Sequence, residues 1–524
     1  MQFRILSTTV FLLAGTASAA AQKPASGAMP AADFDAYVAG ALKTLDAPGA
    51  AVAIVKDGKL VFAKGYGVKK LGSPEPVDPH TLFQIASNTK AFTTAALAML
   101  VDEGKLKWDD PVTKYLPWFE LSDPYVSREL TVRDLLTHRS GLGLGAGDLL
   151  WFHSNYSRDE VLHRIRYAHI ASSFRSRYAY DNVLYIAAGE VVAAASGQPW
   201  EVFVRERILK PLGMTEALTG VAQLTDGANI ASPHSLIDDK TQVVSLDSID
   251  VTAPAGGIIA NVTDIAKWMI AQLDSGRTGN QRLWSTARTR EMWAGQTILP
   301  IELAPTPALV PVTPNFAEYG LGWFLQDYRG HKIVTHTGEL SGMTSRTLLV
   351  PDARLGIIVL TNAETPLLNV ISFRAMDDML GTPRVDWAGL DAAAYRKALA
   401  AGADAEAKAA SGRNRDSKPS LALVKYAGDY NDQMYGDASI AEENGQLVLR
   451  FTHSPEFTGN LEHWQYNTFV AHWRTKNIPD AFVTFALTPR GDIDSMKMAA
   501  VSPLADFSFD YQDLLFHPVA KDTH

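Results

Sequence analysis

The sequence predicts an α/β protein in which a mixed antiparallel sheet is flanked by helices, with an all-helical subdomain and a small C-terminal β-barrel domain. Strand-like runs occur near the start of the chain and return after residue 330, while the segment between them is mostly helical. Beyond residue 420, short alternating runs are separated by Asn, Gly and Pro, as in a separate β domain. With 524 residues, 47% of them hydrophobic, the chain can bury a large core.

The first elements can be read in order. Residues 32–49 carry apolar side chains on one helical side, and residues 50–67 hold two strand-like runs around Asp57-Gly58, a strong two-residue hairpin turn. A helix is predicted to begin at Ser87 and to end near Gly104.

Helical patterns continue through the middle, at "TVRDLLTH", "DNVLYIAAGEVVAAASG", "EVFVRERILKPLG" and "NVTDIAKWMIAQL". Strands then return as "KIVTHTG", "SRTLLVPD" and "LGIIVLTNA". Because strands lie at both ends of this unit, we expect the early and the late strands to share one sheet.

Four segments are predicted. Residues 1–21 resemble a cleaved secretory signal, with a positive start, an apolar run and small residues at the cleavage site, so we expect a periplasmic or secreted protein without stable membrane insertion. Residues 31–385 form the main domain. Residues 386–420 are alanine-rich and charged, which indicates a linker that is helical at first, and residues 421–516 form the β domain.

Composition excludes several function classes. The net charge is −9 with acidic and basic residues interspersed, which argues against a nucleic-acid partner. The chain contains no cysteine, so thiol nucleophiles and disulfides are excluded, and its 13 histidines lack metal-ligand spacing. The motifs of α/β-hydrolases, zinc peptidases and P-loop proteins do not occur. We therefore expect no metal and no cofactor.

"SNTK" places Lys90 one helical turn after Ser87, at the start of an apolar run. A serine at a helix N-terminus is most often a cap. It can also be a nucleophile, because a lysine at i+3 lies on the same face and loses its proton more easily when buried.

Two further patterns favour the nucleophile. "YDN" precedes a helix, and its Tyr180 could relay a proton if a cationic lysine lowers its pKa, while Asn182 could hold a substrate carbonyl. "HTG" ends a predicted strand, where His336 could donate hydrogen bonds and Gly338 would let a substrate approach the backbone.

In this order and spacing, the three patterns resemble the serine hydrolases related to class C β-lactamases, penicillin-binding proteins and D-alanyl-D-alanine carboxypeptidases (peptidase S12-like). The resemblance covers about residues 31–385. It implies that Ser87 attacks a carbonyl to form an acyl-enzyme. It also implies that Lys90 and Tyr180 together transfer the proton from Ser87 to the leaving group. Which group acts as the base stays open.

The resemblance also implies the substrate-binding side. Asn182 would position the substrate, and His336, Thr337 and Gly338 would line the opposite wall, with His336 holding a polar or anionic group or aiding proton transfer. The backbone N–H groups of Ser87 and Glu339 would form the oxyanion hole.

Two departures from the family pattern matter. His336 stands where many β-lactamases carry lysine, and it resembles the arrangement in certain carboxypeptidases, aminopeptidases and esterases, which argues against a dedicated β-lactamase. Asp181 fills the middle of Tyr-x-Asn, and we expect its carboxylate to face solvent. The predicted substrate is a small molecule or a peptide with D-residues or unusual linkages, including linearised cyclic peptides such as microcystins, which some relatives trim.

Alternatives remain open. A carboxylesterase or a broad β-lactamase is the second interpretation, and a slowly deacylating penicillin-binding or sensor module is the third. The oligomeric state is not predicted.

The C-terminal domain resembles the lipocalin-like barrel appended to many of these hydrolases. Four of its aromatic residues could form a lip over the site, although barrel packing is the commoner fate: Trp464, Tyr466, Phe469 and Trp473.

Overall fold

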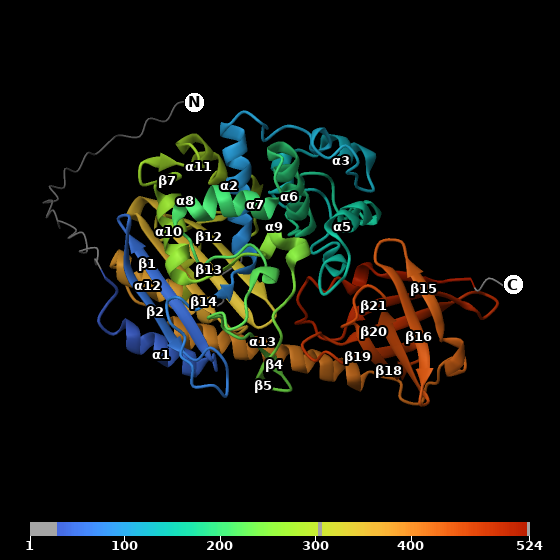
Figure 1. Cartoon of the computed structure of the whole chain (residues 1–524). Helices are drawn as coiled ribbons and strands as arrows, with labels where there is room; N and C mark the ends of the chain where they lie inside the picture. Colours follow the sequence, from blue (N-terminus) through green and yellow to red (C-terminus); the bar gives the residue numbers. More distant parts are fainter. Residues whose placement is uncertain (1–28, 302–306, 521–524) are drawn as a thin grey trace, which may run out of the picture.

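A computed structural model describes residues 29–301 and 307–520 (Figure 1). The predicted signal segment, residues 1–21, lies outside the described residues. Within the described part of the chain, no helix has both the length and the apolar character needed to cross a membrane.

The main domain is built on an eight-stranded sheet whose strands all pair antiparallel. In spatial order the strands are β2 (Lys59–Gly67), β1 (Gly49–Lys56), β14 (Leu355–Thr361), β13 (Met343–Val350), β12 (His331–Leu340), β11 (Phe324–Tyr328), β10 (Ala317–Tyr319) and β9 (Thr297–Ile298). β1 pairs with β14, so the expected meeting of early and late strands is confirmed (Figure 1).

Local sequence explains the central strands. Asp57 and Gly58 both have positive φ, 51° and 76°, which is the conformation of a type I′ turn between β1 and β2. Every residue of β13 and β14 is buried, because helices cover both faces of the sheet; the near-continuous apolar sequence of β14 fits this position, whereas β13 also buries Thr344 to Thr347. α1 (Phe34–Thr44) and α12 (Leu367–Leu380) pack on one face, and α10 (Val262–Leu273) packs on the other.

The helical subdomain surrounds α2 (Thr89–Asp102), which follows a 3₁₀ turn, η1 (Ala86–Asn88). The other helices are α3 (Pro124–Glu129), α4 (Val132–Leu135), α5 (Arg158–Arg164), α6 (Val183–Ser196), α7 (Trp200–Val204), α8 (Lys210–Leu212), α9 (Ala253–Gly256) and α11 (Thr286–Met292). Three two-stranded sheets complete it: β3 (Phe83–Gln84) with β6 (Ile259–Ala260), β4 (His234–Ile237) with β5 (Lys240–Val243), and β7 (Arg277–Thr278) with β8 (Gln281–Arg282). α2 packs against α6 and α9 and is buried from residue 89 to residue 100, so the lysine on it is enclosed by protein.

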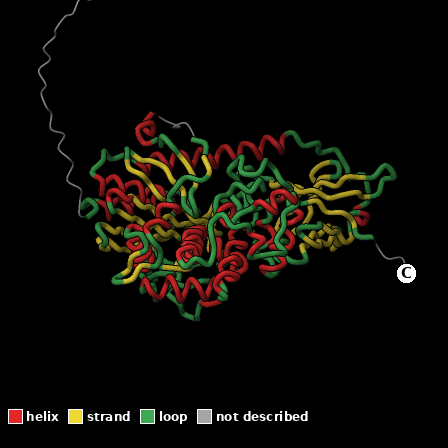
Figure 2. The backbone as a smooth tube through the Cα atoms, turned by 90° about the horizontal axis from the view of Figure 1, so that it is seen from above, coloured by secondary structure: helices red, strands yellow, loops and turns green. Residues whose placement is uncertain are grey.

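The C-terminal domain is a closed barrel, and the predicted fold class is therefore confirmed. Its strands are β15 (Gly428–Asp432), β16 (Gly436–Glu443), β17 (Gln446–Phe451), β18 (Thr458–Gln465), β19 (Thr468–Trp473), β20 (Ala481–Leu487), β21 (Ile493–Ala500) and β22 (Leu515–Pro518). Figure 2 shows these strands gathered at one end of the molecule.

The helix expected at the start of the 386–420 segment is present as α13 (Trp387–Ser411). α13 runs from the sheet towards the barrel (Figure 1) and packs against α12. Gly402 of α13 lies close to the barrel residue Leu504, since a Cβ on the glycine would come 2.5 Å from the Leu504 Cδ1. The barrel is thus packed onto the rest of the molecule rather than tethered to it.

Candidate active site

A cavity of about 730 Å³ opens between β12, the helical subdomain and the barrel. Residues from all three parts line it. Most of the residues predicted from sequence are among them: Ser87, Tyr180, Asn182, His336, Thr337 and Glu339. Lys90 lies directly behind Ser87 and is fully buried.

Ser87 sits in the middle of η1, just before α2. Ala86 has a φ of +47°, a left-handed conformation that is uncommon for a residue with a side chain and that is often found at functional sites. The Asn88 side chain donates to Ser345 Oγ of β13 at 2.7 Å and so ties the turn to the sheet. Asn88, not Ser87, occupies the N-cap position of α2, and it makes no side-chain cap. The capping interpretation of Ser87 is therefore wrong.

The Lys90 amine has three neighbours at hydrogen-bond distance. Its Nζ lies 2.7 Å from Asn182 Oδ1, 3.2 Å from the Ala255 carbonyl oxygen and 3.0 Å from Ser87 Oγ. The Asn182 and Ala255 oxygens can only accept hydrogen bonds, so two N–H groups of the amine donate to them. The remaining tetrahedral direction at Nζ points at the Ser87 hydroxyl. In a neutral amine that position is the lone pair, which can accept the Ser87 proton.

Electrostatics favours the neutral amine. Burial lowers the pKa of Lys90 to about 7, although the charges of Asp148 and Asp181 oppose this shift. A neutral Lys90 is therefore accessible near pH 7 without any further activating group.

Asn182 is oriented by Asp148, a residue that the sequence patterns did not single out. The Asn182 amide nitrogen donates to Asp148 Oδ2 at 2.9 Å, which turns its oxygen towards Lys90. Asp148 also accepts from the Trp151 indole nitrogen at 2.8 Å. Burial raises the pKa of Asp148 to about 7. A lone aspartate in a glycine-rich loop carries no sequence signal for this role.

Tyr180 lies against the lysine, with the Lys90 Nζ 4.6 Å from the centre of its ring. Its pKa is raised well above the usual value by burial, while the Ser87 hydroxyl opposes the rise. The expected lowering of the Tyr180 pKa by a cationic lysine is thus wrong, because desolvation of the buried phenol is the dominant effect and raises its pKa. A proton relay through this phenol stays a prediction.

Asp181 is fully buried, and the expectation that it faces solvent is wrong. Its carboxylate accepts from the Leu184 backbone N–H at 3.1 Å in the first turn of α6, where backbone donors are free. Burial, with the nearby Asp148, raises the pKa of Asp181 to about 8.

Gly338 lies where β12 passes η1. β11 pairs with β12 only as far as Thr335, and the following stretch of β12 packs against η1 instead. A Cβ on Gly338 would come 2.2 Å from the Ile85 carbonyl oxygen and 2.9 Å from the Ser87 backbone nitrogen, so only glycine fits. The Ser87 and Glu339 N–H groups as oxyanion donors stay a prediction.

His336 is buried, and both of its ring nitrogens contact protein groups. Nδ1 lies 2.5 Å from the Thr337 carbonyl oxygen, which requires a proton on Nδ1, and Nε2 lies 3.0 Å from the Tyr319 hydroxyl, from which it accepts. Burial, together with the Lys90 charge, lowers the pKa of His336 to about 3. The imidazole is therefore neutral, and in this arrangement it does not offer a cation to an anionic substrate group. Thr337, next to it, is exposed to the cavity.

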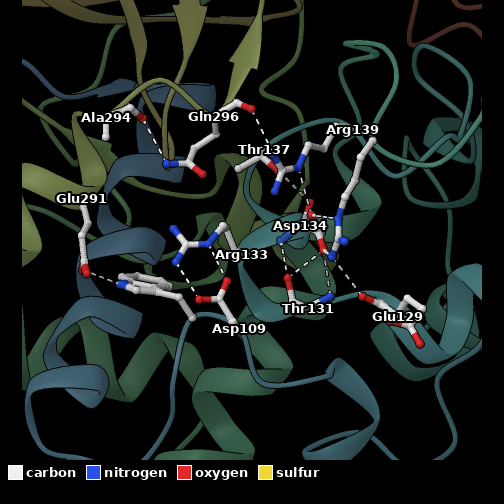
Figure 3. Close-up of polar contacts among 12 residues, drawn as sticks. Asp109, Glu129, Thr131, Arg133, Asp134, Thr137, Arg139, Glu291, Ala294 and Gln296 are labelled. Atoms are coloured by element: carbon white, nitrogen blue, oxygen red, sulfur yellow. Dashed lines mark hydrogen bonds and ion pairs between the residues drawn. The ribbon is translucent and has the colours of Figure 1, made fainter.

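A polar network surrounds Asp134, four residues before His138 in the chain (Figure 3). Asp134 is fully buried and accepts from Arg139 Nε at 3.0 Å and from Arg175 Nη2 at 2.6 Å. These bonds hold the segment that carries His138, whose ring stacks on Tyr180 with 4.2 Å between the centres. His138 was not predicted as a site residue.

Comparison with known proteins agrees with this arrangement. The family model described as Beta-lactamase matches residues 34–375. The chain belongs to the Beta-lactamase family. It is accordingly a serine hydrolase by family. A second model, described as a domain of unknown function (DUF3471), matches residues 412–518, the part of this Beta-lactamase family protein that contains the barrel.

Relatives of this Beta-lactamase family protein include the unguisins hydrolase ungD of Aspergillus violaceofuscus, 29% identical over 88% of this chain and 86% of the relative. Protein flp of Staphylococcus aureus is 28% identical over 60% of this chain and 59% of the relative. Among solved structures, the octameric penicillin-binding protein homologue from Pyrococcus abyssi aligns with a TM-score of 0.59 at 21% identity, covering 89% of this chain and 98% of that one. The D-amino acid amidase from Ochrobactrum anthropi SV3 gives 0.54 at 22% identity, covering 67% of this chain and 99% of that one.

The four aromatic residues considered as a lip do not line the cavity. Phe469 and Trp473 are buried inside the barrel, whereas Tyr466 is 58% exposed. Other aromatic residues form the walls of the cavity instead: Trp151, Phe152, Tyr178, Phe324, Phe507 and Phe509.

Among the described residues of this Beta-lactamase family protein, no group of three or more His, Asp or Glu is placed to hold a metal ion.

Replacing Gly338 by alanine is expected to lower kcat/KM by about 100-fold or more. The added methyl would push β12 away from η1 and disturb the Ser87 N–H, and one lost oxyanion donor typically costs about 3 kcal/mol of barrier. Gly40→Ala is the matched control, because a Cβ at Gly40 of α1 meets nothing within 4 Å. Both variants should melt as cooperative proteins, and unchanged kinetics in Gly338→Ala would contradict the assignment of β12 to the oxyanion wall.

Proposed function

We propose that this protein is an exported serine hydrolase that cleaves an amide bond in a peptide through an acyl-enzyme on Ser87. The observation that carries the proposal is the placement of the Lys90 amine, with two of its N–H bonds accepted by Asn182 and Ala255 and its third position at Ser87 Oγ. Ser87 attacks the carbonyl carbon while Lys90 takes the hydroxyl proton. The same proton then goes to the leaving nitrogen, and water completes the cycle by the reverse route.

The charges on the cavity wall guide the choice of substrate. Three carboxylates line the cavity, from Glu339, Glu364 and Asp506. Burial and the other two charges raise the pKa of Glu339 to about 7, which means that this wall resists further negative charge. Among the described lining residues, Lys476 supplies the permanent cation. Since His336 is neutral, the wall favours a neutral or cationic peptide group over the carboxylate of a β-lactam.

Two other observations support a peptide substrate of unusual chemistry. A relative that aligns over most of both chains is named for hydrolysis of unguisins. The cavity is also large enough for several residues, and its aromatic walls suit apolar side chains. The signal-like residues 1–21 support the proposal of export.

A substrate panel tests the proposal. D-alanyl peptides, linear peptides from opened cyclic peptides, p-nitrophenyl esters and nitrocefin are compared by kcat/KM, with Ser87→Ala as the background. We expect a peptide to be turned over many times per enzyme and nitrocefin to be poor. A preference for short esters of more than about a hundredfold, roughly 2.7 kcal/mol of transition-state energy, would replace the peptidase by an esterase. Product limited to one equivalent would identify a slowly deacylating module instead.

A further inference from the structure

The barrel reaches the catalytic cavity through the connection between β21 and β22. Residues 504–509 of this connection line the cavity. The Phe507 ring meets the Tyr180 ring edge-on, with 5.7 Å between the centres. Gly145 of the helical subdomain lies so close that a Cβ there would come 2.6 Å from the Phe507 carbonyl oxygen. The C-terminal domain therefore builds part of the site that contains Ser87.

Asp510 directly follows the cavity-lining residues of this connection and is fully buried. Its Oδ2 accepts from the Gly147 backbone N–H at 2.8 Å, and its Oδ1 accepts from the Leu149 backbone N–H at 3.2 Å. The Tyr435 hydroxyl of the barrel also donates to Asp510 Oδ2. One barrel carboxylate thus holds the backbone on both sides of Asp148, more than 360 residues earlier in the chain.

Asp148 connects this contact to the catalytic groups. It accepts from the Asn182 amide nitrogen at 2.9 Å, and the Asn182 oxygen accepts from Lys90 at 2.7 Å. An asparagine amide has a donor side and an acceptor side, so its orientation decides whether Lys90 meets an oxygen or a repelling N–H group. A shift of Asp148 would release the amide and, with it, the amine that points at Ser87.

We infer that Asp510 of the C-terminal barrel is a positioning residue for catalysis. It fixes the Gly147–Leu149 backbone so that Asp148 orients Asn182, and Asn182 holds the Lys90 amine against Ser87. Neither Asp510 nor Asp148 lines the cavity, so Asp510 acts on the rate of the reaction at Ser87 and not on substrate contact. The inference rests on the proposed role of Ser87 as nucleophile.

The test measures the reactivity of Ser87 in the full-length chain with a fluorophosphonate probe, so that no natural substrate is needed. In this reaction Ser87 Oγ forms a bond to phosphorus, the phosphorus–fluorine bond breaks, and the hydroxyl proton leaves through Lys90. Labelling rates are measured against probe concentration, which separates the limiting rate from half-saturation. Mass spectrometry of the labelled peptide identifies the site.

Asp510→Ala is expected to lower the limiting rate by about 100-fold, the scale for a small displacement of a reacting group, with half-saturation unchanged. Asp510→Asn keeps one acceptor oxygen and should recover about tenfold of that loss. Asp264→Asn is the matched control. Asp264 is also a buried carboxylate that accepts two backbone N–H groups, from Glu216 and Ala217, but these donors lie in the main domain and have no contact with Asp510. This control should stay within about threefold of wild type.

Each outcome has a defined meaning. A wild-type protein that is not labelled at Ser87 overturns the proposed function, and the inference with it. A labelled wild type with equal limiting rates in Asp510→Ala overturns the inference alone, as does an equal loss in Asp264→Asn. If thermal melting shows that Asp510→Ala does not fold, the near-isosteric Asp510→Asn decides: about a tenfold loss supports the inference, and a wild-type rate overturns it.

Discussion

Replacement of Ser87 by alanine is expected to lower kcat/KM by about 10⁶-fold, the scale seen when a serine nucleophile is removed from an enzyme of this mechanistic type. Without Oγ there is no atom to form the acyl-enzyme, and the neighbouring Lys90 amine has no hydroxyl from which to take a proton. The measurement is turnover of the best substrate of the panel, together with intact-protein mass after incubation, which should show no acyl adduct.

The fold of Ser87→Ala should be intact. The Ser87 side chain does not cap α2, and the turn that carries it is held by the Asn88 bond to Ser345. Thermal melting within about 2 °C of wild type is expected, because surface-like polar substitutions away from caps and cores change stability little. A folded variant that retains wild-type rates would remove Ser87 from the mechanism and leave the cavity without its proposed chemistry.

Local sequence patterns are sufficient to predict much of the fold. The type I′ hairpin was readable because Asp57-Gly58 is a pattern whose backbone conformation is intrinsic to the residues. Ser87 and Lys90 were readable for the same reason, since a spacing of three places both side chains on one helical face. Their joining to Asn182 required a family resemblance, because no local rule brings residue 182 to residue 90.

The incorrect sequence predictions for Asp181 and Tyr180 both concern the burial of a side chain. The sequence places Asp181 in solvent because an isolated carboxylate is usually exposed, whereas packing of α6 encloses it, and a neutral carboxyl has the lower free energy there. The sequence also predicts a lowered pKa for Tyr180 from the charge of Lys90, but both groups are desolvated together. Neither Asp148 nor Asp510 lies in a recognisable sequence motif. Their roles follow from a contact between two domains that only the tertiary structure shows.

The pH dependence of kcat/KM tests Lys90 as the base that activates Ser87. Burial lowers the pKa of Lys90 to about 7, so the amine is protonated and inactive as a base below this pH and neutral above it. Activity should therefore rise with pH, with a midpoint near 7, and level off above about pH 8. His336 cannot give this limb, because its pKa is lowered to about 3. The buried carboxyls of Asp148 and Asp181 have pKa values raised to about 7 and 8, and their ionisation would favour the protonated, inactive lysine.

Lys90→Met decides between these assignments, because methionine fills the buried space and carries no proton acceptor of comparable strength. We expect a loss of about 10⁴-fold in kcat/KM, the upper range for removal of a general base, and loss of the limb near pH 7. Lys90→Arg keeps a cation that does not deprotonate, so it should be equally slow and equally flat. A limb that persists near pH 7 in Lys90→Met would assign the titration to the carboxyls. A rate within tenfold of wild type would give the task of activating Ser87 to Tyr180, whose ring lies next to the amine and whose hydroxyl faces Ser87.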